Sequence, residues 1–150
     1  MRRLLPVLVL LLAGCSAPAP PAVTFYADGH AVDATPTLYC DVKSENCAED
    51  AAAETTLAVR PGYPVQISVP GDVADSAWAV NVLYASEGRQ QVMRSPVFTP
   101  AEVKHAYTLT LPGKSDQVVR VEVQQFGTRI ESNGDGVDFV ARGIWVLNAG

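Results

Sequence analysis

The chain has 150 residues, of which 48% are hydrophobic and 18% are charged, and its formal net charge is -5. This length and composition predict one globular domain, and they exclude both a disordered chain and a pair of ordinary domains. Apart from Arg2 and Arg3 at the start, the 11 basic residues form no cluster, so the charge pattern argues against nucleic acid as a partner.

Residues 1–14 have the features of a bacterial lipoprotein signal peptide. Arg2 and Arg3 precede the apolar run LLPVLVLLLA, which is about half as long as the ~20 residues that a membrane-spanning helix needs. The sequence LAGC, which ends at Cys15, resembles the lipobox, in which the cysteine receives diacylglycerol and the leader is removed just before it. We therefore predict that Cys15 becomes the lipidated first residue of the mature protein. The alternative is an ordinary secreted protein in which Cys15 is incidental.

A proline-rich linker follows, so that residues 15–22 comprise the lipidated cysteine and this linker. The sequence SAPAPPA favours the polyproline II conformation, which at ~3.1 Å per residue would hold a domain about 20 Å from the bilayer. Two acyl chains on Cys15 would anchor the protein stably, because each buried methylene contributes ~0.8 kcal/mol. We expect residues 23–150 to form a domain on the extracytoplasmic face of the cell membrane, held there by this lipid anchor.

Two further cysteines, Cys40 and Cys47, lie in the stretch YCDVKSENCAED. In an exported protein an even pair of cysteines predicts a disulfide. The chain-entropy relation gives about 2.5 kcal/mol of stabilisation for a closed loop of about eight residues. Metal binding is the alternative, but the chain has no second cysteine pair and only two histidines. The spacing also differs from the C-x-x-C of redox sites.

Short strands separated by turns are predicted along the first half of the domain. VTFYA at 23–27, LYCDV at 38–42 and TTLAV at 55–59 are candidate strands. AEDAAAE at 48–54 indicates a short helical turn, and the following RPGYP indicates a chain reversal.

Four later stretches alternate between apolar and polar residues, as half-buried strands do. PVQISVP, SAWAVNVLYAS, YTLTL and VVRVEVQQF each place one set of side chains toward a core. The predicted inward sets are Val65, Ile67 and Val69; Trp78, Val80, Val82 and Tyr84; Tyr107, Leu109 and Leu111; and Val119, Val121 and Val123.

The end of the chain predicts a hairpin, and a helical turn is predicted earlier. In RIESNGDGVDFVARGIWVLN the bend at 133–136 contains Asn-Gly, which supplies the positive φ angles of a tight turn. Between two of the preceding strands, TPAEVKH at 99–105 predicts one or two helical turns. Thr99 would be the N-cap and Glu102 would complete a capping box.

Seven or eight short strands at intervals of about ten residues predict an all-β fold, an antiparallel immunoglobulin-like β-sandwich of about seven strands. A small β-barrel is the alternative. The strand that contains Trp78 is similar to the central strand of immunoglobulin-like domains, where a buried tryptophan fills the space between the sheets. The cysteines of the inter-sheet disulfide found in antibody domains are absent here.

The acidic bend near the C-terminus is not a recognisable calcium loop. Asn133, Asp135 and Asp138 supply oxygen atoms, but the stretch lacks both the spacing and the final glutamate of an EF-hand. We interpret it as a polar turn, and no metal site or cofactor is predicted anywhere in the chain.

No motif in the sequence predicts catalysis. His30, near Asp28 and Asp33, could act as an oriented imidazole, but no nucleophile motif accompanies it. His105 is interpreted as a surface residue. The neighbouring acids of PGDVADSAW, Asp72 and Asp75, are interpreted as parts of a turn, because glycosidase carboxylates cannot be recognised from sequence spacing.

Trp145, in the sequence GIWVL, is the remaining candidate for a binding residue. Its strand is hydrophobic in both phases near its end, so the sequence permits an outward and an inward orientation. An outward Trp145 would belong to an exposed apolar patch that binds a protein or lipid. An inward one would pack on its neighbours.

Several of these features together resemble a known family. The lipobox leader, the proline-rich spacer, PGYPVQISVP, AWAVNVLY and GIWVL are similar to those of the actinobacterial lipoproteins gathered as domain-of-unknown-function family 2771. The resemblance implies an envelope lipoprotein with a small β domain, and it carries over no catalytic residue.

The sequence thus favours a non-enzymatic, membrane-tethered β domain that binds a protein or another component of the cell envelope. An envelope hydrolase with converging acids and His30 is one alternative, and a carrier of an apolar ligand between the sheets is another. The partner itself is not encoded in any motif of the sequence.

Overall fold

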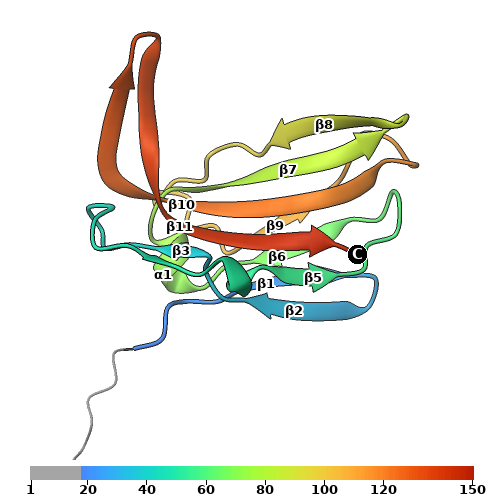
Figure 1. Cartoon of the computed structure of the whole chain (residues 1–150), viewed down its shortest axis with the longest axis horizontal. Coiled ribbons are helices and arrows are strands. Elements are labelled where there is room, and N and C mark those ends of the chain that lie inside the picture. Colours follow the sequence, from blue (N-terminus) through green and yellow to red (C-terminus); the bar gives the residue numbers. More distant parts are fainter. Residues whose placement is uncertain (1–17) are drawn as a thin grey trace, which may run out of the picture.

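Two β-sheets pack face to face in the part of the chain that the structure, a computed structural model, describes, residues 18–150 (Figure 1). The smaller sheet has four antiparallel strands in the order β2-β1-β6-β9. Their bounds are β1 Val23–Ala27, β2 His30–Ala34, β6 Val65–Ser68 and β9 Ala106–Leu109.

The larger sheet has seven strands. Six follow the order β4-β3-β11-β10-β7-β8, and β5 pairs with β11 in parallel. Their bounds are β3 Leu38–Tyr39, β4 Ala48–Glu49, β5 Thr55–Leu57, β7 Trp78–Ser86, β8 Arg89–Arg94, β10 Gln117–Asn133 and β11 Gly136–Ala149. The only helical elements among the described residues are the 3-10 turn η1 (Ala51–Ala53) and the single turn α1 (Gly71–Ala74).

The predicted all-β sandwich is confirmed, with more strands than the seven or so expected. Among residues 18–150 neither sheet closes on itself, so the barrel alternative is wrong. No helix of this part of the chain is long and apolar enough to cross a membrane. The leader and Cys15 lie outside the described residues, so cleavage and lipidation remain predictions.

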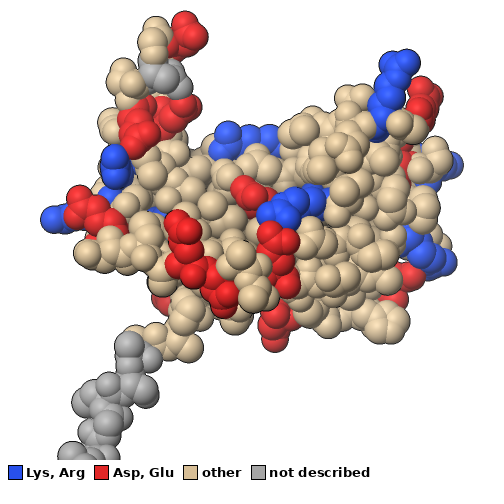
Figure 2. Space-filling model, in the orientation of Figure 1, with Lys and Arg blue, Asp and Glu red and all other residues tan. Residues whose placement is uncertain are grey.

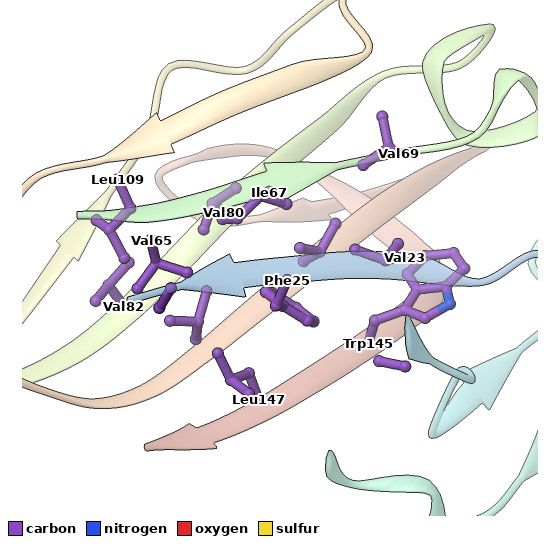
Figure 3. Packing of buried hydrophobic residues seen from close by; sticks show 14 of the residues in the cluster. Val23, Phe25, Val65, Ile67, Val69, Val80, Val82, Leu109, Trp145 and Leu147 are labelled. Atoms are coloured by element: carbon purple, nitrogen blue, oxygen red, sulfur yellow. The ribbon is translucent and has the colours of Figure 1, made fainter. Parts of the chain in front are cut away.

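The core lies between the two sheets and follows the predicted alternation (Figure 3). Fully buried side chains from the smaller sheet meet fully buried ones from the larger sheet; they include Val23, Phe25, Val65, Ile67 and Leu109 on one side and Trp78, Val80, Val121, Val123, Trp145 and Leu147 on the other. One predicted phase is wrong at its start: Val118 is buried in place of Val119. A register shift between Val118 and Arg120 displaces the alternation there by one residue.

The helical turn predicted at 99–105 does not form a helix. A single turn remains, in which the Glu102 N–H donates to the Thr99 carbonyl (3.0 Å). The reason is tertiary: the Trp78 indole donates to the Lys104 carbonyl (3.2 Å), and Trp78 pairs with Phe98 as a β-bridge. These contacts hold the segment as a loop against the core, because packing outweighs a weak local helix preference.

The hairpin of β10 and β11 is confirmed, with Asn133 opposite Gly136 across the bend. Neither Gly134 nor Gly136 has a left-handed φ, so the positive φ angles predicted for the bend are wrong for these glycines. Pairing between β10 and β7 ends at Gln125, opposite Trp78. Beyond that point residues 127–142, here called the arm, bend away and project from the end of the sandwich (Figure 1).

Candidate interaction site

Large apolar side chains cover one face of the arm without a core to receive them. Ile130, Val137 and Phe139 are 58%, 60% and 56% exposed. Ile130 pairs directly with Phe139, and Val137 lies two residues from Phe139 on the same strand, so all three share a face. The Phe139 ring is 6.0 Å from that of the buried Phe126, so this face continues into the base of the arm. A contiguous exposed patch of this kind is typical of an interaction site.

Two irregularities in the β10–β11 pairing bend the arm. Gln125 pairs with Gly143 and Phe126 pairs with Ala141, so Arg142 is an extra residue in β11 with no partner opposite. A second shift lies between Phe126 and Ile130. β-Bulges bend a strand, raise its twist and redirect side chains. Here the first bulge places Arg142 at the junction of sandwich and arm.

The disulfide loop supports the arm at this junction. The predicted disulfide between Cys40 and Cys47 is confirmed. The Cys40 N–H donates to the Arg142 carbonyl (2.7 Å), and the Thr128 N–H donates to the Val42 carbonyl (3.0 Å). A Cβ at Gly127 would clash with the Ser44 hydroxyl and would lie 3.0 Å from the Val42 carbonyl oxygen, so only glycine permits this close approach without a shift. The disulfide thus stabilises a loop that holds both strands of the arm.

A charged side chain organises the disulfide loop from within. The Asp41 carboxylate accepts hydrogen bonds from the Lys43 and Glu45 backbone N–H groups (both 2.9 Å) and from the Asn46 side-chain amide (2.8 Å). The backbone donor of Glu45, followed by the Asn46 amide, lowers the pKa of Asp41 below its usual 3.8. The hydrogen bonds of the folded loop therefore stabilise the ionised form of the Asp41 carboxyl relative to its protonated form.

Two hollows lie beside the base of the arm and share Phe126 and Phe139 as walls. The first, of about 330 Å³, also includes Val42, Thr128 and Arg142. The second, of about 350 Å³, is lined in addition by Arg94, Val97, Gln124, Val137 and Asp138. The first hollow combines mainly apolar walls with a few polar groups, as binding sites do, and both volumes suit individual side chains or a short segment.

Arg142 is a half-buried cation in the wall of the first hollow. Its Nη2 donates to the Tyr39 hydroxyl (3.3 Å), and its guanidinium carbon is 5.5 Å from the centre of the Tyr39 ring. Its Nε is buried, and within the described chain nothing accepts a hydrogen bond from it. None of the ion pairs of residues 18–150 includes Arg142. The guanidinium is thus left without a compensating carboxylate.

Trp145 is not the exposed binding residue that one interpretation predicted. Its side chain is fully buried, its indole N–H donates to the Pro21 carbonyl (2.9 Å), and its ring packs edge-on against Tyr39 at 6.2 Å. Trp145 pairs with Val123 on the core side of the larger sheet, which explains the inward orientation. At Gly143 an added Cβ would lie 2.6 Å from the indole, so the glycine leaves room for this packing.

The structure does not bring the predicted catalytic candidates together. His30 is on β2 and His105 directly precedes β9, so the two lie at opposite edges of the smaller sheet. The His30 Nδ1 contacts the Asp28 carbonyl (3.0 Å). The Asp28 carboxylate pairs with Arg60, and Asp33 accepts from a threonine hydroxyl.

The acids of the two turns belong to segments other than those of the histidines. Asp72 and Asp75 are exposed, and α1 (Gly71–Ala74) contains the first while the second caps its end. Asp135 is in the bend of the arm, and Asp138 pairs with Glu131 across the hairpin. Within residues 18–150 no group of three or more His, Cys, Asp and Glu side chains could hold a metal ion.

Comparison with known proteins identifies a family that matches the chain. A family model described as "Protein of unknown function (DUF2771)" matches residues 16–149, nearly the whole chain. The chain belongs to this family. Relatives of the DUF2771 chain include uncharacterised proteins of Mycobacterium bovis and of two strains of Mycobacterium tuberculosis. Each is 26% identical over 144 residues, which cover 87% of this chain and 86% of the relative. No solved structure matches the chain.

Sequence reasoning did not identify the exposed apolar face of the arm in this DUF2771 protein. Ile130, Val137 and Phe139 flank a polar bend, and by pattern alone they resemble ordinary strand residues that face a core. A signal was available in the length of the hairpin: its strands have 17 and 14 residues, more than the nine of β7, the strand that pairs with β10. Strands longer than their neighbours must extend beyond the sheet.

Proposed function

We propose that this DUF2771 protein is a non-enzymatic binding module, tethered through a lipidated Cys15 to the extracytoplasmic face of the cell membrane, whose arm holds a protein partner in the envelope. The observation that carries the proposal is the row of exposed apolar side chains on the arm, Ile130, Val137 and Phe139. More than half of the surface of each of these side chains is exposed, so this apolar area is available for a partner.

The position of the linker supports a partner away from the bilayer. The Trp145 indole holds Pro21, so the end of the linker belongs to the folded domain. If residues 15–20 form the predicted polyproline II spacer, they would span roughly 15–20 Å at ~3.1 Å each. Residues 18–22 leave from the same end of the sandwich as the arm but run in the opposite direction (Figure 1). A domain tethered in this way would present the arm outward.

In-cell photocrosslinking tests the proposed docking surface. A photoreactive amino acid replaces Phe139 in the full chain, and a matched control replaces Val92, which is 76% exposed on the edge strand β8. We expect a discrete protein adduct from position 139 and none from position 92, and Ile130→Ser with Val137→Ser should remove the adduct. Equal labelling from both positions, or no protein adduct at 139, would contradict the proposal.

The tether has its own test. Cys15→Ala should move the protein from the membrane fraction to the soluble or precursor fraction, because the acceptor of the acyl chains is lost. Unchanged partitioning into detergent would reject lipidation at Cys15 while leaving the proposed docking surface standing.

A further inference from the structure

We propose that Arg142 binds a carboxylate of the partner, so that the arm site takes an extended protein segment in which an Asp or Glu lies next to an aromatic or branched apolar side chain. This inference rests on the proposed function and specifies the chemistry of its partner. It combines a cation without a counter-ion, the apolar hollow beside it and the bulge that holds the two together.

The first step concerns the charge of Arg142. A half-buried guanidinium normally pairs with a carboxylate, since a charge removed from water without a partner destabilises the fold. Arg60, Arg120 and Arg129 all have such partners. Arg142 has only the Tyr39 hydroxyl and ring, and its buried Nε remains unsatisfied. Unsatisfied buried groups are rare in native proteins.

The second step concerns the way in which the backbone fixes this side chain. Arg142 is the extra residue of a bulge, and its carbonyl accepts from Cys40 of the disulfide loop. The adjacent Gly143 allows Trp145 to pack beneath it. The Arg142 side chain therefore projects from backbone that these contacts hold in place, and not from a free loop. Preorganisation of this kind lowers the entropy lost when a ligand binds.

The third step concerns what lies beside the cation. The hollow of about 330 Å³ that Arg142 lines also has Phe126, Phe139 and Val42 in its walls. An apolar side chain in this hollow would place a neighbouring carboxylate near the guanidinium, which can form paired hydrogen bonds with it. Asp75 lines the same hollow but forms no ion pair with Arg142, so it does not neutralise the cation.

Charge also favours a protein segment over a lipid. Glu131, Asp135 and Asp138 give the arm an acidic outer part (Figure 2). Negative charge there would repel the anionic headgroups of a bilayer. Loss of the leader with its two arginines would make the net charge of the chain two units more negative than -5. A protein segment with a single Asp or Glu among apolar or basic residues would be repelled less by this acidic surface than an anionic bilayer would.

Peptide selection tests the inference. Random twelve-residue peptides displayed on phage are selected on the folded chain carrying residues 15–150, and the pool is then measured against Arg142→Gln. We expect enrichment of Asp or Glu within about two residues of an aromatic or branched apolar residue. Binding of these peptides should fall at least about tenfold in Arg142→Gln, since a charge-assisted hydrogen bond is lost.

Three variants sharpen the result. Arg142→Lys should recover only part of the binding, because an ammonium keeps the charge but not the planar fork. Asp75→Asn should strengthen binding a few fold, because it removes a like charge from the same hollow. Arg94→Gln, in the second hollow, is the matched control and should lose less than Arg142→Gln. Thermal unfolding of each variant checks that the fold is retained.

Other outcomes overturn the inference. A selected pool without carboxylate enrichment, no selected peptide at all, or equal binding to Arg142→Gln would each do so. Cosedimentation with phosphatidylglycerol vesicles that depends on Arg142 would replace the protein segment with a lipid headgroup. If position 139 still crosslinks a protein in cells while Arg142→Gln has no effect, only this inference fails. If position 139 crosslinks nothing, the proposed function fails with it.

Discussion

The same two strands build the interior of the sandwich and the arm, and the two regions use their apolar side chains in opposite ways. In the sandwich, Val123 and Trp145 face each other across β10 and β11 and are fully buried. In the arm, Ile130 and Phe139 are also paired, but each is more than half exposed. Both pairs are direct cross-strand partners, so the pairing cannot explain why one pair is buried and the other is exposed. What differs is the side of the sheet: the extra residue Arg142 changes the phase of β11, so the arm pair faces away from the side that the smaller sheet covers.

The difference teaches that exposure on the arm is a consequence of architecture. The bulge at Arg142 separates the two regions, and the disulfide loop supports the arm where the smaller sheet no longer does. Substitutions in the sandwich should therefore change stability, and substitutions on the exposed face of the arm should change binding. The following predictions test this division, starting with the largest effect.

Trp145→Ala should destabilise the domain by about 3–5 kcal/mol, because it removes a fully buried indole and leaves a cavity. Phe139→Ala, on the arm, should change stability by no more than about 0.5 kcal/mol. Urea unfolding followed by tryptophan fluorescence measures both, with Trp78 as the remaining probe in the first variant. Comparable losses would show that the arm contributes to the core and would break the division.

Replacement of both Cys40 and Cys47 by serine should cost about 2.5 kcal/mol through the greater entropy of the unfolded chain. Hydrogen exchange should accelerate first at Thr128, whose N–H donates to the disulfide loop. Amides of β1 (Val23–Ala27) should be affected only through global unfolding. Faster exchange at β1 than at Thr128 would contradict the role of the loop as a support for the arm. Reduction of the wild-type protein serves as the matched control.

Gly127→Ala should destabilise the protein by about 1–2 kcal/mol, toward the lower part of the range for overpacking. Its Cβ would meet the Val42 carbonyl at 3.0 Å and also the Ser44 side chain, which can move. Gly134→Ala is the control, because a Cβ there meets nothing within 4 Å and the φ angle is not left-handed. Differential scanning calorimetry of the pair isolates the contact between arm and loop. Equal melting temperatures for the two variants would refute it.

Much of the sandwich was predictable because its strands are half buried. The bounds of β1 match the predicted 23–27, and the alternation at Val65, Ile67 and Leu109 identifies core side chains correctly. The edge strand β8 was missed because five of its six residues are exposed, so its sequence RQQVMR has no apolar phase. Edge strands of this kind are defined by their neighbour and not by their own pattern.

The candidate site was less predictable for a different reason. The pairing of Cys40 with Cys47 follows from composition and compartment, but its contact with the arm depends on residues about a hundred positions away. The bulge at Arg142 changes the phase of β11, so that Val137 and Phe139 are exposed while Trp145 and Leu147 are buried. Single-residue shifts of register leave no clear mark in a strand that is apolar in both phases.

The smallest effect concerns the pH response of the loop that supports the arm. Donation by the Glu45 N–H, and then by the Asn46 amide, lowers the pKa of Asp41, so the carboxylate stabilises the loop at any pH above its unfolded value of about 3.9. That contribution is lost as pH falls through the lower folded value, and it should not vary between about pH 5 and 8. A carboxyl NMR titration should give Asp41 a midpoint below 3.8, and protection of the Glu45 amide should fall over the same range. In Asp41→Asn this pH dependence should vanish, because a neutral amide oxygen accepts at every pH. A midpoint at or above 3.8, or amide protection that is unchanged on acidification, would show that the Asp41 carboxylate does not order the loop. The disulfide and Gly127 would then be the features that hold the loop in place.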